Sequence, residues 1–252
     1  MIEKKIHYIW LGKSQKSSLM LDCIQSWHQI MPDWQILQWD ESNFDIESVP
    51  LIKHLYDKKQ FAYAADMIRA HVLYKYGGIY LDTDVQVLRP LDDFLQYDFF
   101  VGYEAKNWCC NAVIGSCAKH PILEMYIKLF NYCIPSKDFQ LFAVHSYSAI
   151  IFFIYGILPD GKTSILNDEI ALFSSEYFYP MHYITKRLRI TQNTHAIHRY
   201  ASSWYGTWRK IGFKTIQFVH FFLPLKLFLK LEKRVAEKTR KKILCILKEI
   251  RL

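Results

Sequence analysis

The chain lacks the features that mark several common classes of protein. An apolar stretch near the C-terminal end, residues 213–231, is too short and too charged for the ~20 apolar residues of a membrane span. The N-terminus lacks the apolar core and small-residue cleavage site of a signal peptide. We therefore expect a protein that stays in the cytosol. The six cysteines include no C-x-x-C pair or zinc-like array, and in a reducing compartment we expect thiols rather than disulfides. There is no internal repeat or low-complexity tract.

The composition is that of an enzyme-sized globular chain. With 252 residues, 51% of them hydrophobic and 16% aromatic, the chain can bury a full core. An α/β enzyme of this length is commonly one domain. We predict a single α/β domain over residues 1–212, followed by a tail over residues 213–252.

Residues 61–85 are the most informative stretch. Apolar residues at helical spacing, among them Ile68 and Val72, predict a helix over residues 62–76. Gly77 and Gly78 then predict its stop. The apolar, β-rich run 79–88 predicts one strand, which Pro90 ends because proline cannot donate to a ladder.

Two carboxylates stand near the end of that predicted strand. Side chains alternate along a strand, so Asp82 and Asp84 are expected to project together, with Thr83 turned away. Paired carboxylates need a cation, and oxygen ligands suit Mg²⁺ or Mn²⁺, which usually complete their shell with water and substrate phosphates. The pattern indicates nucleotide-diphosphate chemistry. The alternative is a solvated strand end with aspartate as a turn residue.

Asp66 and Arg69 lie three residues apart on the predicted helix. At this spacing they are neighbours, so they either pair with each other or both face a ligand. A plain ion pair on the helix surface is the alternative.

Three separated segments together resemble glycosyltransferase family 32. Residues 64–69 and 76–84 resemble its sugar-binding and DXD region, residues 6–12 its opening strand, and residues 198–204 its His-x4-Ser-Trp block. The resemblance implies the GT-A fold, a central mixed sheet flanked by helices. In such open α/β sheets the nucleotide lies at the carboxyl ends of the strands.

The resemblance also implies roles at the first two motifs. Trp10 would stack on the nucleotide base while the strand backbone near Ile9 reads the base edge; the alternative is a core tryptophan. Asp84 would bind the metal directly, and Asp82 would contact ribose and donor sugar, partly through metal-bound water. Thr83 is included among the substrate-binding residues.

Further roles follow from the same resemblance. Asp66 and Arg69 would bind the donor sugar, and Asn111 would face the transferred sugar. His198 would complete the metal shell, which favours Mn²⁺ over Mg²⁺. A structural histidine, with His195 as its neighbour, is the alternative. The hydroxyl and indole groups that would donate to the diphosphate are on Ser203 and Trp204, with Ser202 as the alternative by one register step.

The reaction implied is transfer of a hexose or N-acetylhexosamine with retention of anomeric configuration. The leaving phosphate would take the acceptor proton, so no general base is assigned. We favour a UDP-sugar donor, although a GDP-sugar also fits the motifs. A metal-dependent phosphohydrolase and a non-catalytic membrane scaffold are the rival interpretations.

The tail carries the positive charge of the chain. From Arg209 onward there are 13 Lys/Arg and three Asp/Glu, whereas the whole chain has a formal net charge of only +8. Residues 232–252 predict a basic amphipathic helix, in which Val235, Ile243, Leu244, Leu247 and Ile250 form the apolar face.

We expect that helix to attach the enzyme to the inner face of the cell membrane. The acceptor would then be an oligosaccharide on a polyprenyl diphosphate, used in capsule or O-antigen synthesis. A docking or dimer helix is the alternative. Nucleic-acid binding is not expected, because no such motif accompanies the cations.

Overall fold

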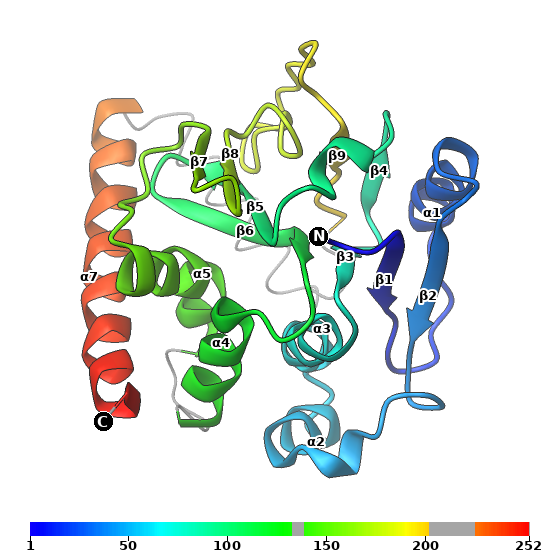
Figure 1. The fold of residues 1–252 in the computed structure, drawn as a ribbon, viewed down its shortest axis with the longest axis horizontal. Coiled ribbons are helices and arrows are strands. Elements are labelled where there is room, and N and C mark those ends of the chain that lie inside the picture. The colour runs from blue at the N-terminus through cyan, green and yellow to red at the C-terminus, as the bar shows by residue number, and fades with distance from the viewer. Residues whose placement is uncertain (133–138, 202–224, 252) are drawn as a thin grey trace.

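The computed structural model describes residues 1–132, 139–201 and 225–251, and it forms a sheet covered by helices (Figure 1). The strands are β1 Lys5–Ile9, β2 Gln35–Trp39, β3 Gly78–Leu81, β4 Val85–Val87, β5 Phe99–Ala105, β6 Trp108–Ser116, β7 Ser164–Leu166, β8 Ile170–Phe173 and β9 Ala196–His198. The helices are α1 Ser18–Ile30, α2 Pro50–Asp57, α3 Phe61–Tyr76, α4 Pro121–Tyr132, α5 Phe139–Tyr155 and α7 Leu225–Arg251, with short 3-10 turns at Ile46–Ser48 and Asp92–Phe94.

The main sheet has seven strands in the order β2-β1-β3-β6-β5-β8-β7. Strands β2, β1 and β3 run parallel to one another, and β5 runs parallel to β8. Strand β6 is antiparallel to both of its neighbours, and β7 is antiparallel to β8. The sheet is therefore mixed, as the predicted fold requires. Strands β4 and β9 form a second, two-stranded antiparallel sheet.

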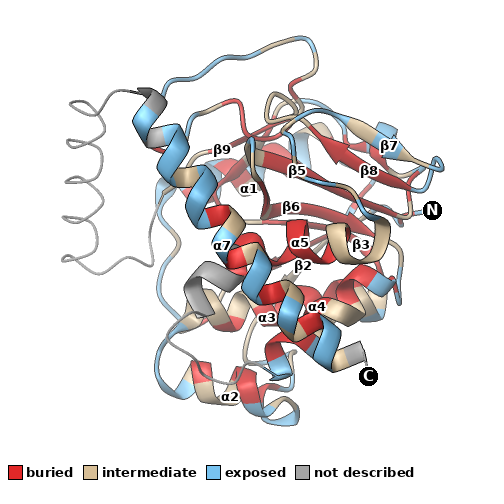
Figure 2. Ribbon diagram, turned by 90° about the vertical axis from the view of Figure 1, so that its left-hand side faces the viewer, coloured by how far each residue is buried: buried red, intermediate tan, exposed pale blue. Residues whose placement is uncertain are grey.

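Both faces of the main sheet are buried, and alternate residues of each strand supply the two cores. In β3, Tyr80 faces the core formed with α2, α3, α4, α5 and α7, whereas Ile79 and Leu81 face the core that contains Trp27 of α1. Figure 2 shows buried residues along the central strands and on the inner faces of the helices. This two-sided burial explains why the strands read as nearly continuous apolar runs.

Helix α3 ends at the glycine pair, as predicted. Gly77 has φ 62° and Gly78 has φ 101°, both in the region that side chains rarely adopt. A Cβ on Gly78 would lie 2.9 Å from the His7 Nε2 and 2.9 Å from the Lys5 carbonyl oxygen. Glycine therefore lets the chain pass close to β1 as it turns from helix into strand.

The predicted single strand over residues 79–88 is wrong. The chain forms β3, turns at residues 82–84, and continues as β4 in the other sheet. The turn is closed by the Val85 N–H, which donates to the Asp82 carbonyl at 2.9 Å. The two acids therefore stand in a turn between two sheets, and strand alternation does not set their direction.

The predicted C-terminal helix is present as α7, and it packs against α5 and α4. Ile243 and Leu247 are fully buried in the main core, and Leu244 and Ile250 are partly buried against it. Much of the apolar face that was expected to meet a membrane thus belongs to the protein's own core. The predicted boundary between residues 212 and 213 lies outside the described residues.

Within the described residues, no helix combines the length and apolar character needed to cross a membrane. The five cysteines in this part of the chain are free thiols, as expected.

Candidate functional site

The turn between β3 and β4 brings Asp82 and Asp84 close to His198. Strand β4 pairs with β9, with Val85 opposite His198, so the residue before Val85 lies beside the end of β9. The Arg199 N–H also donates to the Asp84 carbonyl at 2.9 Å. This pairing joins residues more than 100 positions apart in the sequence at one edge of the fold.

Asp82, Asp84 and His198 each point a potential ligand atom into this region. These three atoms all lie within 4.8 Å of one another. The closest approach recorded is 3.3 Å, between the His198 Nε2 and the Asp84 Oδ1. The other Asp84 oxygen accepts from the Ala201 N–H at 2.7 Å. Two carboxylates and an imidazole form a donor set suited to a divalent cation.

Asp84 and His198 also stabilise each other's charged forms. Burial raises the pKa of Asp84, but His198 and the Ala201 N–H outweigh it, so that pKa falls below its ordinary value. Burial lowers the pKa of His198, but the Asp84 charge outweighs it, so that pKa rises. Asp84 is therefore an ionised carboxylate at neutral pH.

Asp66 and Arg69 do pair, but inside the protein rather than on the helix surface. The Arg69 Nη2 lies 2.8 Å from the Asp66 Oδ1 and 3.1 Å from the Asp82 Oδ1. Arg69 also donates to the Asn111 carbonyl, and its guanidinium lies over the Tyr80 ring, 4.1 Å from the ring centre. The Arg69 side chain is only 4% exposed, so its cation is committed to the two carboxylates.

Two further side chains complete this network. The Asn111 amide donates to the Asp66 Oδ1 at 2.9 Å, and the Tyr80 hydroxyl donates to the Asp82 Oδ1 at 2.8 Å. Burial raises the pKa of Asp66 to about 6, although Arg69 opposes the shift. Asp66 therefore stays largely ionised at neutral pH and can still accept hydrogen bonds.

Trp10 reaches the same edge of the sheet from β1. Strands β1 and β3 are parallel, with His7 opposite Tyr80, and continuing that register places Ile9 level with Asp82. Trp10 follows directly and is only partly buried, so it is not a core tryptophan. Its indole N–H donates to the Ser14 carbonyl at 2.6 Å, and the Lys16 ammonium lies 5.3 Å from its ring centre.

The remaining predicted site residues are Thr83, Ser203 and Trp204. Thr83 is partly exposed in the turn between the acids. Ser203 and Trp204, with the alternative Ser202, lie outside the described residues. His195 does not join the Asp84 group, since its ring stacks parallel to the Tyr177 ring.

Sequence reasoning missed Tyr80, Glu104 and Cys110. Tyr80 had a usable signal, because it stands two residues before Asp82 on the same strand. Glu104 and Cys110 carried no motif, and only the pairing of β5 with β6 brings them near His198.

The mixed sheet and the acids at its strand ends agree with the GT-A type of glycosyltransferase that the sequence resembles. The family "Glycosyltransferase sugar-binding region containing DXD motif" matches residues 17–100. Among sequence relatives, an uncharacterized glycosyltransferase of Acanthamoeba polyphaga mimivirus is 31% identical over 194 residues, which cover 71% of this chain and 74% of that protein. The chain belongs to this family of DXD-containing glycosyltransferases.

A second relative comes from yeast. Inositol phosphoceramide mannosyltransferase 3 of Schizosaccharomyces pombe is 33% identical over 162 residues, or 61% of this chain. The match covers only 43% of that longer enzyme. Among solved structures, the PaToxG glycosyltransferase superposes with a TM-score of 0.52 at 18% identity, covering 62% of this chain and 70% of that one. This likeness agrees with the GT-A fold. The fold therefore agrees with the glycosyltransferase family to which the chain belongs.

Proposed function

We propose that the protein transfers a hexose or N-acetylhexosamine, with retention, from a UDP-sugar, and that the reaction depends on Mn²⁺ or Mg²⁺. The observation that carries the proposal is the convergence of Asp82, Asp84 and His198, whose ligand atoms lie within 4.8 Å of one another. DXD glycosyltransferases generally use a divalent metal. Asp84 and His198 would hold the ion directly, and Asp82 would reach it through water.

The ion, when bound, supplies positive charge that stabilises the diphosphate leaving group. The protein's own residues supply position. Arg69 and Tyr80 fix one oxygen of Asp82, which leaves the other oxygen of that carboxylate for ribose or bound water. The Ala201 N–H fixes one oxygen of Asp84 in the same way. Carboxylates that are held before the substrate arrives lose little entropy when it binds.

Asp66 and Asn111 are proposed to recognise the donor sugar. The Asp66 carboxylate accepts from sugar hydroxyls, and the Asn111 amide, which donates to the Asp66 Oδ1, fixes its orientation. Arg69 takes a different role from the one the resemblance implied. Its guanidinium is occupied by Asp66, Asp82 and a main-chain carbonyl, so it positions the carboxylates rather than contacting sugar or phosphate.

The nucleotide itself would lie between the first and last motifs. Trp10 would stack on the base at the end of β1, next to the strand that leads to Asp82. Ser203 and Trp204 would donate to the diphosphate. We assign no general base, because a retaining transfer with front-face attack passes the acceptor proton to the leaving phosphate.

Donor turnover tests this proposal. Purified protein with Mn²⁺ and a panel of UDP- and GDP-sugars is assayed for released nucleoside diphosphate, in the wild type, Asp84→Asn and the control Asp22→Asn. Asp22 is an exposed carboxylate on α1. We expect release from one donor, a loss of about 100-fold or more in Asp84→Asn, and no change in the control. Turnover that survives Asp84→Asn, or that chelation leaves unchanged, would contradict the metal role.

The acceptor is proposed to be an oligosaccharide on a polyprenyl diphosphate, at the inner face of the cell membrane, in surface polysaccharide synthesis. Two observations support a lipid-borne acceptor. The yeast relative is named for transfer to a membrane lipid, inositol phosphoceramide. On α7, Lys230, Arg234, Lys238 and Lys241 share one exposed face by their spacing.

The same side of α7 exposes apolar groups beside those cations. Leu227, Leu231 and Val235 recur every four residues and are each at least 44% exposed. Cations together with apolar side chains favour the surface of an anionic membrane. The outer side of α7, opposite the face buried on the core, is therefore the proposed membrane contact.

Vesicle sedimentation tests the contact. The variant carries Glu at the four exposed α7 cations, and the control carries Glu at four exposed lysines elsewhere, Lys13, Lys58, Lys119 and Lys162. We expect wild type and control to sediment with anionic vesicles and not with zwitterionic ones, and the α7 variant to stay in solution. Equal binding by both variants would contradict an α7 contact.

A further inference from the structure

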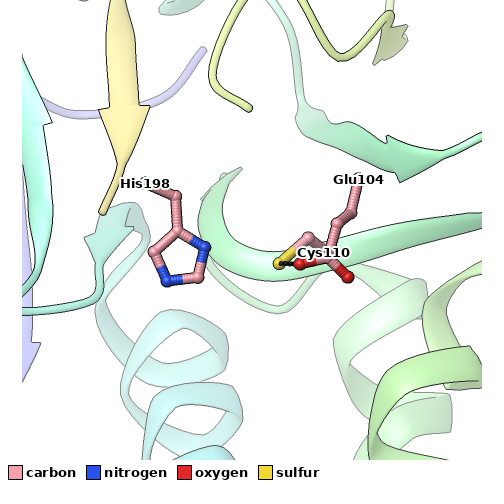
Figure 3. A group of neighbouring side chains, drawn as sticks. All are labelled: Glu104, Cys110 and His198. Atoms are coloured by element: carbon pink, nitrogen blue, oxygen red, sulfur yellow. Dashed lines mark hydrogen bonds between the residues drawn. The ribbon is translucent and has the colours of Figure 1, made fainter. Parts of the chain in front are cut away.

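A second group of ligand atoms meets at His198 on the side away from the DXD turn. Glu104 of β5, Cys110 of β6 and His198 of β9 place one ligand atom each within 4.8 Å of one another. Figure 3 shows the Cys110 sulfur and the Glu104 carboxylate side by side, with the His198 ring facing them. Cys110 is 8% exposed and His198 is 9% exposed, so this is an interior site.

The β5–β6 hairpin produces this arrangement. Gly102 pairs with Cys110, and the register shifts between Tyr103 and Ala105, which is where Glu104 stands. Cys110 lies opposite Gly102 and shares its face of the sheet. Glu104 comes two residues after Gly102, at the register shift, and therefore projects to the same side as Cys110. The Trp108 indole N–H donates to the Glu104 Oε2 at 3.0 Å, which fixes the carboxylate and leaves Oε1 on the side of the thiol.

The spacing between these two groups suits a small tetrahedral ion. The Cys110 Sγ lies 3.7 Å from the Glu104 Oε1. Zinc bonds of about 2.3 Å to sulfur and 2.1 Å to oxygen at a tetrahedral angle separate the two ligand atoms by about 3.6 Å. The two side chains therefore stand at a zinc-like separation.

His198 contributes a nitrogen that the DXD turn does not use. Its Nε2 faces Asp84, while its Nδ1 is buried and has no hydrogen-bond partner within the described part of the chain. In Figure 3 the ring nitrogen next to the side-chain attachment, which is Nδ1, points toward Cys110. A buried nitrogen without a partner is costly unless a ligand occupies it.

We propose that Glu104, Cys110 and the His198 Nδ1 bind a thiophilic divalent cation such as Zn²⁺. On binding, the Cys110 thiol releases its proton to solvent as the metal–sulfur bond forms, and the thiolate and carboxylate balance the two positive charges. A thiolate selects Zn²⁺ over Mn²⁺ or Mg²⁺, so this site and the Asp82–Asp84 turn differ in the ions they take.

Occupation of this site acts on the transferase through the shared histidine. A neutral imidazole has one free lone pair in its ring plane, so an ion on Nδ1 leaves the ring proton on Nε2. The Nε2–H then faces Asp84 and cannot bind the second ion. Micromolar Zn²⁺ should therefore inhibit Mn²⁺-supported turnover. This consequence rests on the proposed function, whereas the binding itself does not.

Cadmium binding tests the site without any assay of activity. Cd²⁺ is titrated into metal-free protein while the ultraviolet charge-transfer band of a cadmium thiolate is followed. The matched control is Cys109→Ser, because Cys109 directly precedes Cys110 on β6 and faces the opposite core. We expect one equivalent to saturate the band in wild type and in Cys109→Ser, and Cys110→Ser to lose it.

A second variant separates loss of the binding site from misfolding of Cys110→Ser. Glu104→Gln keeps the thiol, and we expect it to bind Cd²⁺ at least about tenfold more weakly than wild type. A band that persists in Cys110→Ser, an unchanged affinity in Glu104→Gln, or no band in wild type would overturn the site.

Inhibition of turnover by Zn²⁺ tests whether the Glu104–Cys110 site affects catalysis. With Mn²⁺ and donor present, we expect Zn²⁺ to inhibit wild type and Cys109→Ser, and Cys110→Ser to resist inhibition at least about tenfold. Cadmium binding without Zn²⁺ inhibition would leave the site in place and overturn the coupling through His198. If no donor is turned over at all, the proposed function fails, while the cadmium result still decides the site.

Discussion

Arg69 pairs with two partly buried carboxylates at once, one from its own helix and one from the DXD turn. Its Nη2 contacts Asp66 and Asp82 at 2.8 and 3.1 Å, and its side chain is almost fully enclosed. Removal of such a cation lowers the stability of the folded protein, because its partners are then left as uncompensated charges.

We predict that Arg69→Met lowers the free energy of unfolding by about 3–5 kcal/mol. The control is Arg89→Met, because Arg89 is exposed and should change stability by less than about 0.5 kcal/mol. Urea unfolding of both variants measures the difference. Equal costs at the two positions would show that the Arg69 network is not a stabilising one.

His7 connects β1 to the turn after α3 as a neutral ring. The Trp39 indole can only donate, so at 3.0 Å it fixes the His7 Nδ1 as an acceptor, and the Nε2–H then donates to the Gly77 carbonyl at 2.8 Å. Burial lowers the pKa of His7 to about 4, although the Gly77 carbonyl opposes the shift. Protonation would break the Trp39 bond and place a charge in the core.

This lowered pKa predicts a loss of stability in acid. Between pH 6.5 and about 4 the unfolded chain binds a proton at His7 that the folded protein does not. The contribution is complete above pH 6.5 and is lost as the pH falls toward 4. At about pH 5 the loss is of the order of 2 kcal/mol.

Comparison with His7→Gln isolates this effect, because glutamine keeps a donor and an acceptor but does not titrate. Unfolding free energies are measured at about pH 7.5 and about pH 5. Wild type should lose about 2 kcal/mol more than the variant on acidification. Equal losses would mean that His7 does not cause the acid sensitivity.

At the scale of elements, local signals predicted α3 and its glycine stop, because helical spacing and left-handed glycines act within a few residues. The break between β3 and β4 could not be predicted in this way. Val85 to Val87 pair with residues more than 100 positions away, and the apolar pattern continues through the turn. The acids converge with His198 because of that pairing.

The candidate site was likewise predictable only in part. The sequence motifs pointed to Asp82, Asp84 and His198, and the ligand atoms of these three residues do lie close together. The role of Arg69 was not predictable, because its bond to Asp82 depends on how α3 packs against β3. Glu104 and Cys110 meet through a strand irregularity that carries no sequence signal.

Helix α7 supplies a prediction about which of its faces matters for stability. Ile243 is fully buried against the core, whereas Val235 is 46% exposed on the outer side. We predict that Ile243→Ala costs about 2–5 kcal/mol and Val235→Ala less than about 0.5 kcal/mol in thermal or urea unfolding. A small cost at Ile243 would mean that α7 is an appendage rather than part of the domain.

On the scale of the whole molecule, the C-terminal end of the parallel strand β1, the β3–β4 turn and β9 meet at one edge of the sheet. Trp10 lies at the end of β1, Asp82 follows β3, and His198 lies in β9. Three motifs that are far apart in the sequence thus lie at one edge of the sheet, and helix α7 packs into the main core. Parallel strands place their carboxyl ends together, which makes this edge the expected nucleotide site.

We propose that Asp84 and His198 hold the cation to which the nucleotide binds. The most direct measurement is anomalous scattering from crystals grown with UDP and Mn²⁺. We expect a manganese peak at bonding distance from the Asp84 carboxylate and the His198 imidazole, with the UDP diphosphate on the same ion. A peak at Glu104 and Cys110 instead, or UDP bound without manganese at Asp84, would contradict it.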